Sequence, residues 1–497
     1  MTLPFAVETA TLRAAQPDWA ARPLSERLRP VREFRHLVVE HADALASAVE
    51  ADVGRKAGEV VATDLLPSAA AAKFLLTDAS RILRPRSVGR RPLWLMGCRD
   101  AVHRRPYGIV GLIGTWNYPV FLTTVPLLHA LTAGNAVLWK PSELTPRTAE
   151  FLHELFAKAG FPEGVLARVP GTREAGPQLA ESDVDFVHFT GSDAVGRKLA
   201  ARLGERLVPS ALELSGVDAV FVLADANVKL AARSAWYGTT LNAGQTCISC
   251  RRAFVHRTVY AKFVEELRPL VDAAGSAWLA TPGQVSQADR LLEDAARAGA
   301  DVLQRPHPPA EIPNPQKAGV RSPVRPAAVL NATPDLAVCR EASFAPLLAV
   351  LPFEDSHQLV PMHDASTFGL AAAVFTADCR AAAELAAKLR VGAVVVNDVI
   401  VPTAHPGTPF GGRRASGWGV TQGEEGLLGM TVPQVVSTRS GTFRPHVDAG
   451  LTGDPAAFDV ARGALRLTHG RGWLERWRGL KQLVGGLRRT KRGDEPG

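Results

Sequence analysis

The chain has 497 residues, which is too long for one ordinary core and predicts two or three domains. Its 46% apolar and 21% charged residues are typical of a soluble globular protein, and five cysteines are too few for a disulfide framework. Of the net charge of +8, residues 456–497 supply +6, from ten Lys/Arg and four Asp/Glu. The basic charge is mostly a tail, so nucleic-acid binding is not expected.

The N-terminal segment lacks the basic stretch and apolar run of a secretory signal. No stretch approaches the roughly 20 uninterrupted apolar residues of a membrane span. We therefore expect a cytoplasmic protein that does not cross a bilayer.

Residues 1–83 carry apolar positions at three- and four-residue spacing, which predicts helices. Residues 84–107 are rich in Arg, Pro and Gly and predict irregular or edge-strand structure. From residue 108 onward, short apolar runs alternate with helical patterns such as 145–160. This alternation is typical of doubly wound parallel sheets, so the predicted fold class is α/β, with two such domains in tandem.

The strands predicted for the first sheet are 108–114, 136–140, 165–171, 184–191 and 207–216. Those predicted for the second are 219–225, 251–256, 347–355, 370–376 and 392–398. The Pro-rich stretch 305–316 is predicted to be a surface loop inside the second domain.

Four polar segments follow predicted strands of the first sheet, where open parallel sheets bind their ligands. They are GTWNYP (114–119), KPSE (140–143), GSDAVG (191–196) and ELSG (213–216). The glycine-rich turn 191–196 can present backbone N–H groups to a phosphate, although such turns also serve as plain connections. It is not the GxGxxG fingerprint.

The stretch NAGQTCISC (242–250) holds Cys247 and Cys250. Cys247 is a candidate nucleophile, redox partner, metal ligand or buried apolar residue. The chain has no second Cys or His pair at zinc spacing, so we expect no metal. Nor does it have a thioredoxin-like context, so we interpret Cys250 as structural, with oxidative protection of Cys247 as the alternative.

These motifs, together with PFGG (409–412) and SGWG (416–419), stand in the order found in the aldehyde dehydrogenase superfamily. The resemblance covers residues 1–440 and is greatest to the class 3, fatty aldehyde branch. It implies an aldehyde dehydrogenase-like fold with four parts. These are a Rossmann-like NAD(P)-binding domain (1–83 and 108–213), a catalytic domain (214–424), a small oligomerisation arm of a homodimer (84–107 and 425–440) and a basic tail (441–497).

The resemblance implies that Cys247 is the nucleophile that forms a thiohemiacetal and then a thioester. Asn117 and the backbone N–H of Cys247 correspond to the oxyanion hole, although Asn117 can also be read as a turn residue. Glu213 corresponds to the general base that activates water.

Lys140 and Glu143 correspond to the family's contacts with the adenosine ribose, which favours NAD while leaving NADP possible. The other residues assigned to the cofactor region are Gly191, Ser192, Gly196, Trp116, Glu341 and Phe344. Trp116 fits apolar packing at the substrate, and Phe344 at the nicotinamide. One departure stands in REASFAP (340–346), where Ala342 replaces the family's usual Glu. Either Glu341 takes over as the ribose anchor or the anchor is missing.

The tail contains GWLERWRGLKQLVGGLRRTKRG, in which apolar residues from Trp473 to Leu487 form one helical stripe beside basic residues. This pattern predicts a peripheral membrane contact through residues 471–492, or else a helix docked on the protein or a partner subunit. The sequence thus predicts NAD(P)-dependent oxidation of an apolar, medium- or long-chain aldehyde to the acid. An acyl-CoA-forming or reductive member, or a non-catalytic membrane-associated member, are the alternatives.

Overall fold

The computed structural model describes residues 3–89, 91–92, 95, 97–305, 322–441 and 455–492. The predicted surface loop 305–316 therefore falls outside the described residues from position 306 on, as do 442–454 and 493–497 of the tail. The chain divides into two compact units, residues 1–83 with 105–432 and residues 84–104 with 433–497.

The N-terminal region is helical, as predicted. Its elements are α1 (Ala6–Ala21), α2 (Leu24–Glu40), α3 (Ala42–Val53), α4 (Ala57–Val60), the π-helical turn η1 (Val61–Leu65) and α5 (Leu66–Ile82). By length and composition, the stretch Ala57–Ile82 could cross a membrane. It buries Val60, Leu65 and Leu75 in the apolar core of this unit, as a core helix does.

The first sheet has six strands in the order β19-β7-β6-β3-β4-β5. They are β3 (Ile109–Ile113), β4 (Ala136–Lys140), β5 (Leu166–Arg168), β6 (Phe186–Gly191), β7 (Ser210–Leu214) and β19 (Gly417–Trp418). All neighbours are parallel except β19, which runs antiparallel to β7. The chain proceeds outward from β3 through β4 to β5 and then returns to β6 on the other side of β3. The switch point lies between β3 and β6, where ligands bind in such sheets.

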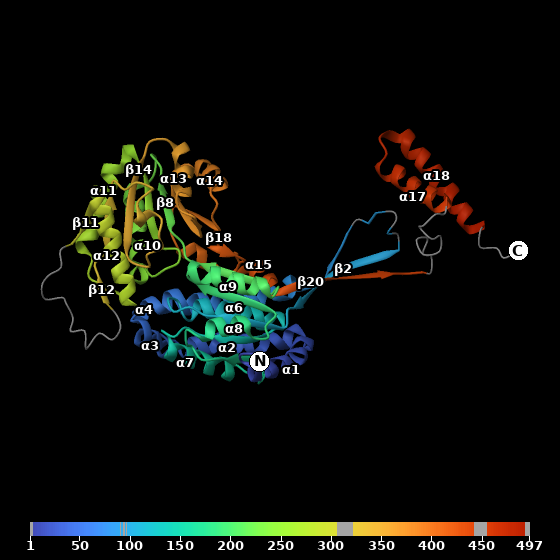
Figure 1. Ribbon diagram of the computed structural model, residues 1–497, viewed down its shortest axis with the longest axis horizontal. Coiled ribbons are helices and arrows are strands. Elements are labelled where there is room, and N and C mark those ends of the chain that lie inside the picture. The colour runs from blue at the N-terminus through green and yellow to red at the C-terminus, as the bar shows by residue number, and fades with distance from the viewer. Residues whose placement is uncertain are drawn as a thin grey trace. The chain divides into compact units, whose positions relative to one another are not determined.

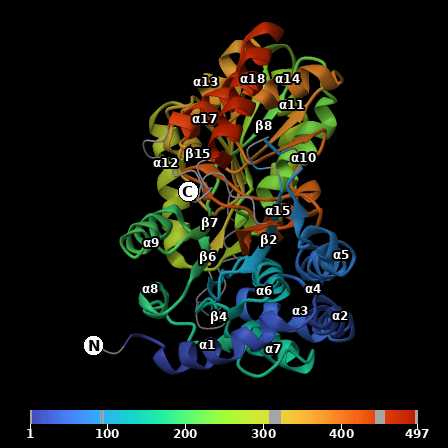
Figure 2. The ribbon, with the colours of Figure 1, turned by 90° about the vertical axis from the view of Figure 1, so that its right-hand side faces the viewer.

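Helices cover both faces of this sheet, which is why its strands are apolar throughout. Figure 2 shows α8 (Ala175–Glu181) and α9 (Asp193–Glu205) on one side, and α2, α3 and α6 (Phe121–Ala133) on the other. Helices α5 and α7 (Pro146–Lys158) share the core on the side of α6. Helix α1 contributes to both sides, since Trp19 belongs to that core and Leu12 to the core on the side of α8 and α9.

The second sheet has seven strands in the order β11-β13-β14-β9-β8-β16-β17. Strands β8, β11 and β14 of this sheet are labelled in Figure 1. They are β8 (Asp218–Val222), β9 (Cys250–His256), β11 (Asp301–Gln304), β13 (Ala327–Leu330), β14 (Leu347–Phe353), β16 (Ala371–Phe375) and β17 (Ala393–Val396). One face packs on α10 (Val228–Thr240) and α11 (Arg257–Ala273). The other packs on α12 (Pro282–Arg297), α13 (Leu359–Asp364) and α14 (Cys379–Lys388).

All ten predicted runs contain strands of these two sheets, which confirms the α/β fold class. Two strands of the second sheet, β11 and β13, were not predicted. Strand β19 falls within 214–424, the range expected for the catalytic domain, yet it joins the first sheet.

The smaller unit contains a three-stranded sheet in the order β1-β2-β20, from β1 (Arg86–Ser87), β2 (Cys98–Pro106) and β20 (Thr431–Arg439). Its tail forms two helices, α17 (Pro455–His469) and α18 (Gly472–Arg492). Two glycines of α18 have a role in packing. A Cβ at Gly479 or Gly486 would overlap α17, so these glycines let the two helices approach closely.

Candidate active site

Cys247 lies in a turn between the 3₁₀ helix η3 (Leu241–Gly244) and β9, and it is 9% exposed. The three residues Asn242, Ala243 and Gly244 have φ values of 50°, 56° and 75°, a left-handed run that is unusual outside glycine. A Cβ at Gly244 would overlap the carbonyl of Ala345, so this position requires glycine. Strained backbone of this kind is typical of functional loops.

Hydrogen bonds hold this loop against the segment that follows β3. The Asn242 side-chain amide donates to the carbonyl oxygen of Asn117 at 3.0 Å. The hydroxyls of Tyr118 and Thr246 are 2.6 Å apart. The Gln245 side-chain amide donates to the carbonyl of Asn242 at 3.1 Å, which closes the turn on itself. The position of Cys247 is therefore fixed by residues of both sheets.

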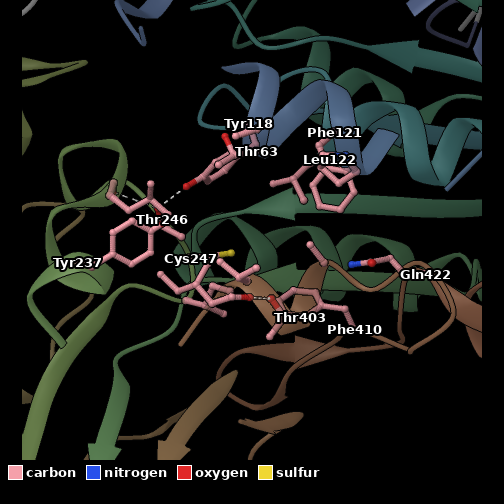
Figure 3. Close-up of a pocket in the computed structure, with 17 residues that line it drawn as sticks. Thr63, Tyr118, Phe121, Leu122, Tyr237, Thr246, Cys247, Thr403, Phe410 and Gln422 are labelled. Carbon is pink, nitrogen blue, oxygen red and sulfur yellow. Dashed lines mark hydrogen bonds between the residues drawn. The ribbon is translucent and has the colours of Figure 1, made fainter. Parts of the chain in front are cut away.

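Two cavities meet at Cys247, and we call them the apolar and the polar cavity. The apolar cavity (Figure 3) measures about 120 Å³ and is lined by Ala62, Thr63, Pro67, Tyr118, Phe121, Leu122, Tyr237, Leu241, Thr246, Cys247, Ile248, Ile400, Val401, Thr403, Ala404, Phe410 and Gln422. None of these side chains is charged.

The polar cavity measures about 510 Å³. It is lined by Thr115, Trp116, Asn117, Thr190, Gly191, Ser192, Asp193, Glu213, Leu214, Ser215, Cys247, Thr281, Gln284, Gln287, Arg340, Glu341, Ala342, Ser343, Phe344 and Phe368. It thus gathers most of the site residues predicted from the sequence, including Cys247, Glu213 and Asn117.

Glu213 stands near the end of β7 and is 5% exposed. Burial raises its pKa to about 7, although a hydrogen bond from Thr190 acts in the other direction. Its Oε1 atom is buried without a partner among the described residues. A carboxylate with a pKa near neutrality and one free oxygen can accept a proton from a nearby thiol or water.

Burial also raises the pKa of the Cys247 thiol, and the nearby Glu213 and Asp218 raise it further. The thiol is therefore protonated at neutral pH and needs a base before it can attack. Glu213 is a base of suitable pKa in the same cavity.

Asn117 is 3% exposed. Its Oδ1 accepts a hydrogen bond from Thr115 at 3.0 Å, and its Nδ2 donates to the carbonyl of Gln245 at 3.0 Å. An amide nitrogen carries two hydrogens, so one remains for an oxyanion in the cavity.

A buried ion pair of Arg55 and Asp64 holds residues 117–121 through hydrogen bonds to their backbone. Arg55 donates to the carbonyl of Asn117 at 3.2 Å and lies 4.4 Å from the ring centroid of Tyr118. Asp64, in the π-helical turn, accepts from the backbone N–H of Phe121 at 2.9 Å. Sequence reasoning missed this pair, because nothing in its spacing indicates that it meets residues 117–121.

Gly191 and Ser192 line the polar cavity at the end of β6. The Ser192 hydroxyl caps α9 by accepting from the N–H of Val195 at 3.4 Å. Gly196 does not line the cavity. A Cβ there would overlap Leu214, so this glycine brings α9 close to β7.

Lys140 and Glu143 also lie outside the lining of the polar cavity, at the carboxyl end of β4. Their side chains are 3.4 Å apart, and Lys140 is almost fully buried. Arg173, which sequence reasoning missed, binds the other oxygen of Glu143 at 3.2 Å. Glu143 thus has two cationic partners.

Trp116 and Phe344 both line the polar cavity, with ring centroids 6.3 Å apart. Phe344 has a φ of 46° and stacks under the guanidinium of Arg251 at 5.3 Å. Its ring is thereby held at the wall of this cavity.

Glu341 lines the polar cavity next to Ala342, but its carboxylate is engaged. It forms an ion pair with Arg290 and accepts from the side chain of Gln287 at 3.4 Å. Sequence reasoning missed both partners, which lie on α12. Glu341 is therefore bound to α12, a helix that packs on the second sheet.

The polar cavity fits a nicotinamide dinucleotide by its size and its chemistry. It opens at the switch point, and Ser192 and Asp193 bring the first turn of α9 to its wall. Trp116 and Phe344 offer flat apolar surfaces near Cys247. The carboxylate of Glu143 lies just after β4, the strand beside β3, and could accept hydrogen bonds from ribose hydroxyls.

The model of the aldehyde dehydrogenase family matches residues 4–436. The chain belongs to this family. It is 33% identical over 429 residues to a 4,4'-diapolycopene aldehyde oxidase of Methylomonas sp, covering 85% of this chain and 79% of that protein. It is 32% identical over 440 residues to a protein of Mycolicibacterium smegmatis provisionally named a succinate-semialdehyde dehydrogenase [NADP(+)], covering 86% and 83%.

Among solved structures, the fold is similar to that of a Mycobacterium tuberculosis aldehyde dehydrogenase complexed with NAD+. The TM-score is 0.81 at 28% identity, and the alignment covers 88% of this chain and 90% of that one. The aldehyde dehydrogenase fold expected from the sequence is thus confirmed.

Proposed function

We propose that this protein oxidises a neutral, apolar aldehyde to the carboxylic acid, with NAD or NADP as the hydride acceptor. The observation that carries the proposal is the position of Cys247, which borders both a polar cavity containing Glu213 and an uncharged apolar cavity. The apolar cavity is suited to the chain of the substrate, and the polar cavity to the cofactor and to water.

In the first step, Glu213 accepts the thiol proton, directly or through water, and the sulfur of Cys247 forms a bond to the aldehyde carbon. The carbonyl oxygen becomes an alkoxide, which accepts a hydrogen bond from the second N–H of Asn117. A bound NAD or NADP, held in the polar cavity by residues such as Ser192 and Phe344, would supply the acceptor for the hydride that the former aldehyde carbon loses. The product on the enzyme is a thioester of Cys247.

Before the second step, Glu213 releases the thiol proton to solvent. The ionised Glu213 then removes a proton from water, whose oxygen attacks the thioester. The carbon–sulfur bond breaks, the acid leaves and the thiolate of Cys247 returns. Passage of the acyl group to coenzyme A needs no such base. The free Oε1 atom of Glu213 therefore supports hydrolysis.

The uncharged lining of the apolar cavity supports an apolar substrate. An anionic aldehyde such as succinate semialdehyde would bury a carboxylate there without a cation, at a large cost in free energy. The name of one relative, 4,4'-diapolycopene aldehyde oxidase, specifies an aldehyde of diapolycopene and not a semialdehyde of an acid. Similarity to the class 3, fatty aldehyde branch remains part of this proposal.

NAD and NADP both remain in the proposal. One structural relative is complexed with NAD+, and the name of one sequence relative specifies NADP(+). Glu143 favours the free ribose hydroxyl of NAD, while Lys140 and Arg173 beside it offset that charge.

The test is reduced-cofactor formation by the purified protein with NAD and NADP, using aldehydes from propanal to hexadecanal and succinate semialdehyde. We expect turnover that rises with chain length, little turnover of succinate semialdehyde, and the free acid as product. Product formed only when coenzyme A is present would instead support acyl transfer. Cofactor binding without turnover of any aldehyde would support a non-catalytic role.

We also propose a homodimer that uses the three-stranded sheet as its arm. Strand β20 is at the edge of this sheet and exposes Val435 by 61% and Val436 by 38%. An exposed apolar edge strand is suited to pairing with another chain. Light scattering should show a dimer that Val435→Lys weakens.

Peripheral membrane contact is the proposal for the tail. The first turns of α18 expose Trp473 by 74%, Leu474 by 56% and Trp477 by 52%. Arg478 and Lys481 follow Trp477 along the helix, which suits an anionic bilayer surface. Sedimentation with anionic vesicles should be lost in a Trp473→Ser/Trp477→Ser variant and kept in Trp418→Ser, which removes a half-exposed tryptophan elsewhere.

A further inference from the structure

Each of the two cavities at Cys247 contains one side chain with a buried polar atom that lacks a hydrogen-bond partner. In the polar cavity it is Oε1 of Glu213, and in the apolar cavity it is Oε1 of Gln422. The other side chains of this kind among the described residues line neither cavity. Since proteins normally pair buried polar atoms, an unpaired one in a ligand cavity indicates a partner on the ligand.

Gln422 precedes the short helix α15 (Gly423–Gly429) and is 4% exposed. Its φ of 61° lies in the left-handed region, where glutamine is uncommon. In Figure 3 its amide points into the cavity, toward the side on which the sulfur of Cys247 lies. The backbone is thus held in an unusual conformation that places an amide inside an apolar cavity.

Several hydroxyl groups that line this cavity already have hydrogen-bond partners. The Thr63 hydroxyl donates to the carbonyl of Glu59 at 2.8 Å, and that of Thr403 to the carbonyl of Ile400 at 2.5 Å. The Tyr118 hydroxyl pairs with Thr246. Around Gln422 the lining consists largely of apolar side chains such as Phe121, Leu122 and Phe410.

We propose that Gln422 is a specificity-determining residue that hydrogen-bonds an oxygen carried on the apolar chain of the aldehyde. The inference rests on the proposed function, because it assigns the apolar cavity to the substrate chain. A hydroxyl group suits the site best, since it can both accept from the amide nitrogen and donate to the amide oxygen. The preferred substrates are then apolar aldehydes with an oxygen function away from the reacting carbonyl.

The test compares ω-hydroxyaldehydes, from 6-hydroxyhexanal to 12-hydroxydodecanal, with the unsubstituted aldehydes that have one carbon more. For each pair, kcat/KM of the hydroxyaldehyde is divided by kcat/KM of the unsubstituted aldehyde. This ratio is measured in the wild type and in Gln422→Met, which keeps the length of the side chain but removes the amide. At the best chain length we expect the variant to lower this ratio by about tenfold, as loss of a buried hydrogen bond does. Phe121→Leu, a control that changes the shape of the cavity only, should change both members of a pair alike.

A second measurement needs no substrate. Because Gln422→Met replaces an amide with an unpaired buried oxygen by an apolar group of similar size, the free variant should melt at an equal or higher temperature than the wild type. Equal ratios in wild type and variant at every chain length, or a melting temperature lowered by several degrees, would overturn the inference. Turnover of the unsubstituted aldehydes would then leave the proposed function standing. No turnover of any aldehyde would remove both.

Discussion

The two cavities that meet at Cys247 differ in origin as well as in polarity. The polar cavity is built largely from strand ends of the first sheet, with α12 and residues 340–344 opposite. The apolar cavity is built from helical segments, among them the 3₁₀ helix Val401–Ala404, and from the loop that carries Cys247. Under the proposed function, this comparison assigns the reaction chemistry to the sheet edge and substrate choice to side chains that helices and loops can vary.

Replacement of the residue that the cavities share should have the largest effect. Cys247→Ala should lower acid formation by on the order of 10⁴-fold or more, because no other nucleophile borders both cavities. Steady-state kinetics with a linear aldehyde measure this. The matched control is Cys250→Ala, which removes a buried thiol three residues away. An equal loss in the control would point to damage of the loop.

In the polar cavity, Glu213→Gln should lower kcat by roughly 10²–10⁴-fold, because a neutral amide cannot accept a proton. Since only the ionised carboxylate is a base, wild-type kcat should rise as pH increases through about 7, the value to which burial raises the pKa of Glu213. This rise should be absent in the variant. Stopped-flow kinetics should also show a slower first burst of reduced cofactor, because Glu213 is the base for the thiol in the proposed first step. The same pH dependence in both proteins would exclude Glu213 as the base.

A substitution at Ala342, in the wall of the polar cavity, should improve cofactor binding. Ala342→Glu should tighten NAD binding by about tenfold, because a free carboxylate at the cavity wall can accept ribose hydroxyls while Glu341 stays bound to Arg290. Calorimetric titration of NAD measures this change. Arg290→Met is the companion variant, since it frees Glu341. Unchanged affinity in both would mean that neither position faces the ribose.

A positive charge placed in the apolar cavity should reduce the preference for uncharged aldehydes. Tyr237 is 44% exposed, so Tyr237→Arg adds a cation at little cost to folding. We expect the preference for hexanal over succinate semialdehyde to fall by roughly fivefold, since the cation can pair with the distal carboxylate. The ratio of kcat/KM values measures this, with Tyr237→Gln as the neutral control. A fall of equal size in the control would assign the effect to shape.

Much of this architecture was predictable because its signals are local. The runs that became β3, β4, β6 and β7 show their burial in their own residues, and the turns after them mark the sheet edge. The polar cavity does bring Cys247, Glu213 and Asn117 together, as the motifs indicated. Contacts between distant segments were less accessible. The engagement of Glu341 by Arg290, and of Glu143 by Arg173, depends on helix and loop positions that no spacing encodes.

The sequence by itself determined the fold class, the family and the candidate nucleophile, because hydrophobic periodicity and short motifs act over a few residues. Only the tertiary structure decided which groups are charged, paired or free. Burial, which sets the pKa of Glu213 and leaves Gln422 without a partner, arises when segments far apart in the chain exclude water together.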